Sequence, residues 1–231
     1  MKNYIKFLTF ALLTIFSACS KNDSDNSFQS YHLIDTYYDT TDAAVVADRT
    51  LIEVSFMSNN PQRVFHSREY TNIAGISQSE VNAARFNQLA AQNNDYYKWQ
   101  VPYITVGNNF SMAYSNAALV AGIRAIELTS DADYDESHPR GTSLTNMITL
   151  MIDSYGEHLG KDLTGTNTAS NVFGEVTKSY RQFTERELSV VGPWMCISID
   201  KLPTLAIKHK MTLTITFTNG DEFKKEINVN F

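Results

Sequence analysis

Hydrophobic and polar residues alternate most clearly at the C-terminal end of the chain. Residues 211–217 alternate apolar side chains with threonines, and residues 223–231 alternate apolar with charged and amide side chains. Asn219-Gly220 separates the two runs, so the pattern predicts a β-hairpin with one buried face. Because side chains repeat every two residues, an odd loop is needed to keep both apolar sets on that face. We expect a three-residue loop, residues 218–220, with Gly220 in the left-handed conformation.

Further short strands are predicted along the chain wherever apolar runs are bounded by turn signals, at residues 51–57, 63–70, 101–106, 123–129 and 194–199. The last of them follows a Gly-Pro break at 192–193. We find neither an internal repeat nor the strand–helix rhythm of a parallel sheet. Short strands separated by turns are typical of an antiparallel β-sandwich, immunoglobulin-like or similar. We therefore expect a mostly β fold with one short inserted helix.

The inserted helix is expected to begin at a capping box, Ser-Gln-Ser-Glu at 77–80, in which two side chains satisfy backbone N–H groups. Apolar residues then recur at helical spacing to about residue 91, namely at Val81, Ala83, Phe86, Leu89 and Ala90. Residues 144–155 fit helical and strand spacing equally; we expect one helical turn near Leu144 and a strand after it. Residues 156–174 are expected to form a long polar loop.

Composition and charge narrow the class of partner. The 231 residues are 43% hydrophobic and 19% charged, with a formal net charge of −6. This is an ordinary globular composition, and the length suits one domain or two small ones. We expect a single sandwich-like domain over 31–231. The chain lacks the basic balance of a nucleic-acid-binding protein, so we expect no nucleic-acid partner.

The first residues read as an export signal. Lys2 and Lys6 precede an apolar run at 7–16, which is followed by Ser17-Ala18-Cys19. The run is shorter than the roughly 20 residues that span a bilayer. An ordinary cleaved signal with a chance cysteine is one interpretation. Residues 16–19 also resemble the lipobox of bacterial lipoproteins, with Phe16 where leucine is usual. That resemblance implies a lipoprotein signal peptide at 1–18 and lipidation, palmitate included, on Cys19.

Residues 19–30 are polar and predict a flexible tether after the lipidated cysteine. With Asp23 and Asp25 they resemble the surface-export tethers of Bacteroidetes-type lipoproteins. We expect a cell-envelope protein that the lipid anchors to the outer membrane, with exposure at the cell surface left open. Lipidation leaves Cys196 without a partner for a disulfide. We interpret Cys196 as a small buried residue on a strand, with a nucleophile as the alternative.

An acidic loop is the candidate metal site. Asp131, Asp133, Asp135 and Glu136 alternate in a way that lets carboxylates converge on a hard cation such as calcium. An EF-hand loop has a glycine at its sixth position and a bidentate glutamate at its twelfth; here these positions are Glu136 and Thr142. The interpretation we favour is a solvated acidic loop. Calcium is the one cofactor that the sequence leaves open.

An aromatic cluster follows a polar stretch at 92–95 and is the candidate ligand-binding site, with Tyr96, Tyr97, Trp99 and Tyr103. Flat aromatic faces stack on sugar rings, and the tyrosine hydroxyls add hydrogen bonds. Tyrosine and tryptophan also favour half-buried positions at the edge of a core. We favour core packing and keep a glycan contact as the functional alternative.

The sequence nominates no catalytic site. The five histidines lack the spacing of a zinc site, and no nucleophile elbow, P-loop or dinucleotide fingerprint occurs. Glycoside hydrolysis needs two opposed carboxylates, and 25 acidic residues single out no pair. We therefore do not expect an enzyme, although the sequence leaves one open.

One internal segment carries a family resemblance. Thr129-Ser130-Asp131, Tyr134 and the run 138–144 (His-Pro-Arg-Gly-Thr-Ser-Leu) are similar to a segment of Bacteroidetes-type surface lipoproteins with no assigned activity. The resemblance implies an extracytoplasmic β-rich domain on a lipid anchor. We expect a non-enzymatic binding or adhesion module for a glycan or an envelope protein. The alternatives are a glycan-processing enzyme or accessory subunit, and a structural subunit of a surface assembly.

Overall fold

The computed structural model describes residues 30–67, 79–95, 97–98, 105–106, 109–110, 116–160 and 174–231. The expected signal peptide, Cys19 and the tether up to residue 29 lie outside the described residues. So do residues 77–78 and 101–104, most of the expected polar loop, and Tyr96, Trp99 and Tyr103. Among the described residues, no helix is long and apolar enough to cross a membrane.

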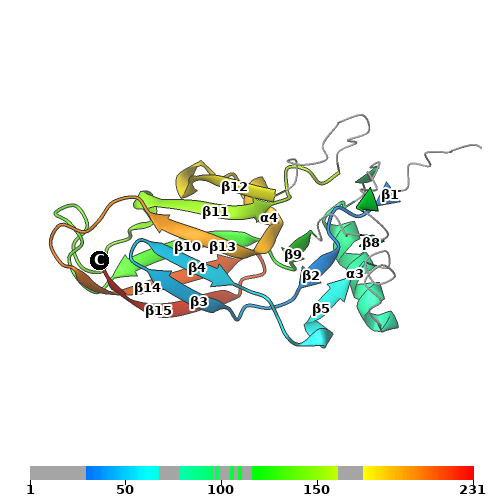
Figure 1. The fold of residues 1–231 in the computed structure, drawn as a ribbon, viewed down its shortest axis with the longest axis horizontal. Helices are drawn as coiled ribbons and strands as arrows, with labels where there is room; N and C mark the ends of the chain where they lie inside the picture. Colours follow the sequence, from blue (N-terminus) through cyan, green and yellow to red (C-terminus); the bar gives the residue numbers. More distant parts are fainter. Residues whose placement is uncertain are drawn as a thin grey trace, which may run out of the picture.

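Two antiparallel sheets form a sandwich, which occupies one end of the molecule (Figure 1). One sheet has five strands, in the order β12 (Gly174–Ser179), β11 (Ile148–Ser154), β13 (Val191–Ile199), β4 (Leu51–Ser55) and β3 (Ala44–Asp48). The other has three, in the order β10 (Ile123–Ser130), β14 (Lys208–Phe217) and β15 (Glu222–Asn230). The expected mostly β, sandwich-like fold with a short helix is confirmed.

The main core lies between these two sheets. Alternate residues of the strands point inward, as in β11, where Ile148, Leu150 and Ile152 are fully buried. From the facing sheet come Leu128, Leu213 and other aliphatic side chains of the same cluster. The period-2 alternation in the sequence thus corresponds to one buried and one solvent-facing side of each sheet.

The C-terminal hairpin is confirmed down to its loop. Thr216 pairs with Glu222, and the backbone N–H of Phe217 donates to the carbonyl of Asp221 at 2.9 Å. Residues 218–220 are therefore the loop, and Gly220 has φ of +90°. The expected order at 144–155 is also confirmed, since a single 3-10 turn, η2 (Thr145–Met147), leads directly into β11.

The expected break at 192–193 is wrong, because β13 continues through Gly192 and Pro193. The register between β11 and β13 shifts between Ile152 and Ser154, so the proline sits at a bulge, where its missing N–H costs no ladder bond. Its carbonyl still accepts the N–H of Phe56 at 2.7 Å. Asp153 packs close to Gly192: a Cβ added at position 192 would lie 2.8 Å from the Cβ of Asp153.

A second, smaller cluster of buried side chains lies beside the sandwich, at the right in Figure 1. It contains a three-stranded sheet of β5 (Val64–His66), β2 (Thr36–Tyr38) and β9 (Ala117–Leu119), in which β2 and β9 run parallel. Helix α3 (Glu80–Gln92) covers this sheet with Phe86, Leu89 and Ala90. The strand expected at 63–70 is described only as β5.

Two details of the expected helix are wrong. Its N-cap is Ser79, whose side chain accepts the N–H of Asn82, so the cap lies two residues after the predicted start. Val81 is 76% exposed, so it belongs to the solvent-facing side of the helix and not to its buried stripe. The remaining elements are short: β1 (Ser30–Tyr31) with β6 (Tyr97–Lys98), β7 (Thr105–Val106) with β8 (Asn109–Phe110), the turns η1 (Pro61–Arg63) and η3 (Tyr180–Gln182), and α4 (Glu185–Ser189).

Candidate functional site

The acidic residues lie in the loop from β10 to η2, residues 131–144, which we call the acidic loop. Asp131 Oδ1 accepts the backbone N–H of Lys210, and Asp133 Oδ1 accepts that of Arg140, each at 2.7 Å. Asp135 Oδ1 accepts the N–H groups of Ser137 and His138, each at 2.8 Å. The structure thus gives each carboxylate its own backbone donors, so the carboxylates act as loop-stabilising acceptors.

Asp135 is also paired with the imidazole of His138, Nδ1 lying 2.8 Å from Oδ1. The hydrogen bond from His138 holds the pKa of Asp135 below its usual range. The other ring nitrogen, Nε2, lies beside the side-chain amide of Asn146, 3.0 Å from Nδ2 and 3.2 Å from Oδ1. The His-Pro-Arg-Gly run is therefore held in one conformation, helped by Gly141 at φ of +81°.

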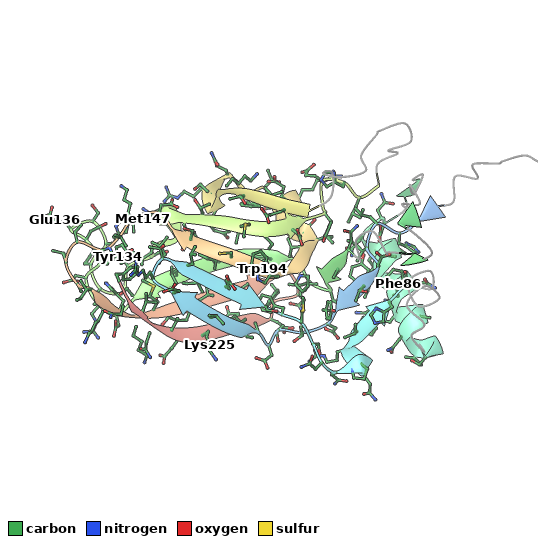
Figure 2. All side chains as sticks on the ribbon, in the orientation of Figure 1. Phe86, Tyr134, Glu136, Met147, Trp194 and Lys225 are labelled. Atoms are coloured by element: carbon green, nitrogen blue, oxygen red, sulfur yellow. The ribbon has the colours of Figure 1, made fainter. Side chains whose placement is uncertain are left out.

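Within the described part of the chain, no three histidine, cysteine or acidic side chains come together as a metal site. Glu136 lies at the outer end of the acidic loop, in Figure 2 at the extreme left. It does not converge with the three aspartates. The carboxylates that the sequence pattern grouped are thus separated by the path of the loop.

Tyr134 connects the acidic loop to the loop between β13 and β14, residues 200–207, which we call the distal loop. The side chain is fully buried, and its hydroxyl donates to the carbonyl of Lys201. Its own carbonyl accepts the N–H groups of Thr204 at 2.9 Å and Leu205 at 3.3 Å. One residue of the acidic loop therefore holds three positions of the distal loop.

A buried serine–histidine pair supports the same junction. Ser130 Oγ lies 2.7 Å from His209 Nδ1, and His209 Nε2 lies 2.9 Å from the carbonyl of Ala206. A carbonyl only accepts, so Nε2 carries the proton and Nδ1 accepts from the serine hydroxyl. His209 also packs on Tyr134 and Phe231, with ring centroids 5.2 and 5.4 Å apart. Both members are buried, and we interpret the pair as structural.

The distal loop exposes three aliphatic side chains although its backbone is tied down. Leu202 is 62%, Leu205 59% and Ile207 63% exposed. The carbonyl of Ile207 accepts the N–H of Phe231 at 2.9 Å, which adds a further anchor. Exposed apolar side chains grouped on one ordered loop indicate an interaction surface more strongly than scattered ones do. We take this aliphatic patch as the candidate functional site.

Sequence reasoning missed this site. The segment Leu-Pro-Thr-Leu-Ala-Ile at 202–207 is short and contains Pro203, so it sustains neither a strand pattern nor a helical one. A usable signal was present, since three aliphatic residues stand between Lys201 and Lys208 in a segment that cannot form a regular element. Such residues are either buried by their surroundings or exposed for binding.

Of the four aromatic candidates, the described residues include Tyr97 alone. Tyr97 lies in β6, where it pairs with Tyr31 of β1, and the other three lie outside the described residues. Cys196 carries a free thiol and is buried on β13 opposite Glu53 of β4. Burial raises the pKa of this thiol, and the Glu53 carboxylate raises it further. These surroundings suit packing rather than nucleophilic attack.

Comparison with protein-family models, curated proteins and solved structures finds no match to this chain. The functional argument therefore rests on the chain's own residues.

Proposed function

We propose that this chain is a lipid-anchored, non-enzymatic binding module of the cell envelope that engages a protein partner through its distal loop. The carrying observation is the aliphatic patch of Leu202, Leu205 and Ile207, more than half exposed on a loop that backbone hydrogen bonds hold in place. A pre-formed loop loses little conformational entropy on binding.

The position of the patch supports this role. The expected tether leads into β1, at one end of the molecule, and the distal loop lies at the opposite end (Figure 1). An anchor on Cys19 would hold the first end near the membrane and leave the distal loop free to reach outward. Figure 2 shows Tyr134, under the distal loop, well separated from Phe86 of α3.

The chemistry of the patch favours a protein over a glycan. Sugar rings stack on flat aromatic faces, whereas leucine and isoleucine fill apolar pockets of a protein surface. Burying one such side chain fully contributes about 1.5–3 kcal/mol. Three such side chains can form the apolar centre of an interface with a polar rim. The flanking Lys201 and Lys208 would then lie at its polar rim.

A photo-crosslinking amino acid at position 205 of the full-length protein, expressed in its own cells, tests the proposal. We expect a discrete protein adduct, which the same probe at the exposed position 225 of β15 does not give. Adding Leu202→Asp and Ile207→Asp should abolish the adduct, whereas Val81→Asp on α3 should not. The absence of any adduct specific to position 205 would overturn the protein-binding assignment.

Two further measurements separate the parts of the proposal. Metabolic labelling with a palmitate analogue should mark the wild type but not Cys19→Ser, and equal labelling would overturn the anchor. Purified residues 19–231 carrying Cys19→Ser should give no specific signal on a glycan array. A signal insensitive to Leu205→Asp would replace the protein partner by a glycan bound elsewhere.

A further inference from the structure

The outer edge of strand β3 has no pairing partner among the described residues. β3 is the last strand of the five-stranded sheet and pairs only with β4, from Ala44 opposite Ser55 to Asp48 opposite Leu51. β15 of the facing sheet lies close to β3, but among the described residues no backbone hydrogen bond joins the two strands, so the outer backbone groups of β3 have no strand partner there. Natural proteins usually protect such an edge with charges, prolines, bulges or covering segments.

The other three outer strands of the sandwich carry this protection. Each bears charged side chains within the strand, at Arg124 and Glu127 in β10, Glu175 and Lys178 in β12, and Lys224 and Lys225 in β15. β3 reads Ala-Val-Val-Ala before Asp48. It is the one outer strand of the two described sheets with a run of four uncharged apolar residues.

The ladder shows which groups face outward. β4 uses its even residues to bind β13, since Phe56 N–H donates to Pro193 and Ile199 N–H donates to the carbonyl of Thr50. Its odd residues therefore bond to β3, at Ala44, Val46 and Asp48. The backbone N–H and C=O groups of Val45 and Ala47 accordingly point away from the sheet.

The solvent-facing side chains of this edge have a definite order. Asp42, Ala44, Val46 and Asp48 are all exposed, and Val46 is 67% exposed. Their alternation places two apolar residues between two carboxylates on one face. A strand laid against β3 meets acid, apolar, apolar and acid at every second position.

We propose that β3 accepts an extended segment of a partner protein as a sixth strand of the sheet, with the pattern basic-x-apolar-x-apolar-x-basic. Hydrogen bonds to Val45 and Ala47 would supply affinity, and the partner's basic residues opposite Asp42 and Asp48 would supply selectivity. Oppositely charged cross-strand pairs each contribute about 0.2–1 kcal/mol. This site is separate from the distal loop and does not depend on the function proposed above.

A second copy of the chain fits this edge poorly. Two copies of β3 would pair antiparallel about a two-fold axis. Their equivalent faces lie on the same side of the sheet only when that axis passes between the same residue of each copy. Centring on Val45 places Asp42 opposite Asp48, and centring on Val46 places the same two carboxylates diagonally. Like charges at these positions are destabilising, so charge complementarity selects a basic partner.

The test measures fluorescence anisotropy of a labelled Lys-Thr-Val-Thr-Val-Thr-Lys peptide with purified residues 19–231 carrying Cys19→Ser. We expect saturable binding, weakened about tenfold or more when both peptide lysines are replaced by glutamates. The double variant Asp42→Lys/Asp48→Lys should reverse this preference. Because reversal is a gain of binding, loss of folding cannot produce it.

Two controls localise the peptide on the edge. Val46→Lys should abolish binding, whereas Val81→Lys on the distant helix α3 should leave it unchanged. Amide exchange of Val45 and Ala47 should slow in the complex. No binding of the lysine peptide at millimolar concentration, equal binding of both peptides to the wild type, or self-association through β3 in sedimentation would overturn the proposal.

Discussion

The carboxylate of Asp95 is completely buried and accepts the backbone N–H of Leu33 at 2.7 Å. Its second oxygen accepts the N–H of Ile34 at 3.2 Å. Asp95 follows the end of α3, and its two hydrogen bonds hold the segment that leads into β2. The bonds therefore connect the end of the helix to the start of the small sheet. Burial raises the pKa of Asp95 to about 6, and the bond from Leu33 and the nearby His32 only partly oppose this.

Asp95 should therefore make the protein less stable as the pH rises. Its pKa in the unfolded chain is about 3.9, so the folded state holds the proton more tightly. The stability it contributes is fully present below about pH 4 and is lost as the pH rises through about 6. Two pH units of separation correspond to about 3 kcal/mol.

Urea denaturation between about pH 4 and pH 7 measures this contribution. Asp95→Asn should remove the corresponding fall in the free energy of unfolding, whatever its effect on absolute stability. The exposed Asp48→Asn should retain the wild-type dependence. If the free energy of unfolding changes with pH in the same way for the wild type and for Asp95→Asn, Asp95 does not titrate as described.

Replacing His209 by leucine should loosen the distal loop without unfolding the sandwich. The change places an apolar side chain beside Tyr134 and removes the ring that bonds the Ala206 carbonyl and the Ser130 hydroxyl, while Ser130 Oγ still accepts the N–H of Ala132. A buried polar group left unsatisfied costs about 1–3 kcal/mol. We expect a loss near the middle of that range, and faster hydrogen exchange at the Thr204 and Leu205 amides.

The matched control for this prediction is Lys208→Leu, one residue away and exposed. It should leave the exchange of Thr204 and Leu205 at the wild-type rate. If His209→Leu leaves exchange unchanged too, the histidine does not anchor the distal loop.

Where alternation was strong, the sequence predicted the structure well. The hairpin of β14 and β15 follows from parity alone, because a wrong loop length would turn every apolar side chain of β15 outward. β3 was missed because Ala-Val-Val-Ala has no alternation, which is the same property that leaves its edge unprotected. The pairing of β2 with β9 was missed because it joins segments of three residues each that lie far apart in the chain.

The surroundings of single polar residues were harder to predict from the sequence, because contacts with distant parts of the chain fix them. Residues 92–95 look like a polar loop, yet Asp95 is buried, since it satisfies backbone groups that lie some sixty positions earlier. In the acidic loop, regular spacing suggested convergence of carboxylates. Each aspartate instead bonds to a nearby or cross-strand amide, which spacing does not encode.

Gly122 should be difficult to replace by any residue that carries a side chain. A Cβ there would lie 2.3 Å from the carbonyl oxygen of Ser189, so the backbone of α4 would have to move. Overpacking of this kind costs about 1–3 kcal/mol, and contact with backbone places Gly122→Ala at the upper end. Chemical denaturation checks the value.

Gly220→Asn is the control for Gly122→Ala. Gly220 has φ of +90° but open space around it, and asparagine tolerates left-handed backbone better than most residues. It should cost about 1 kcal/mol, the lower end of the range for a side chain in left-handed backbone. Equal losses in both variants would mean that the contact with Ser189 does not limit the size of residue 122.

Calcium should leave the stability of the protein unchanged. Asp131, Asp133 and Asp135 each use an oxygen to accept backbone N–H groups within 2.8 Å, and they do not converge. Binding a cation at the acidic loop would require the loop to change its path so that the carboxylates come together. We expect the midpoint of thermal unfolding to differ by less than about 1 °C between millimolar calcium and excess chelator. A stability change of a few tenths of a kcal/mol would give a shift of about that size. Calorimetric titration should show no binding heat. A saturable heat that disappears in Asp133→Asn would instead establish a calcium site there and would mean that the loop rearranges to bind it.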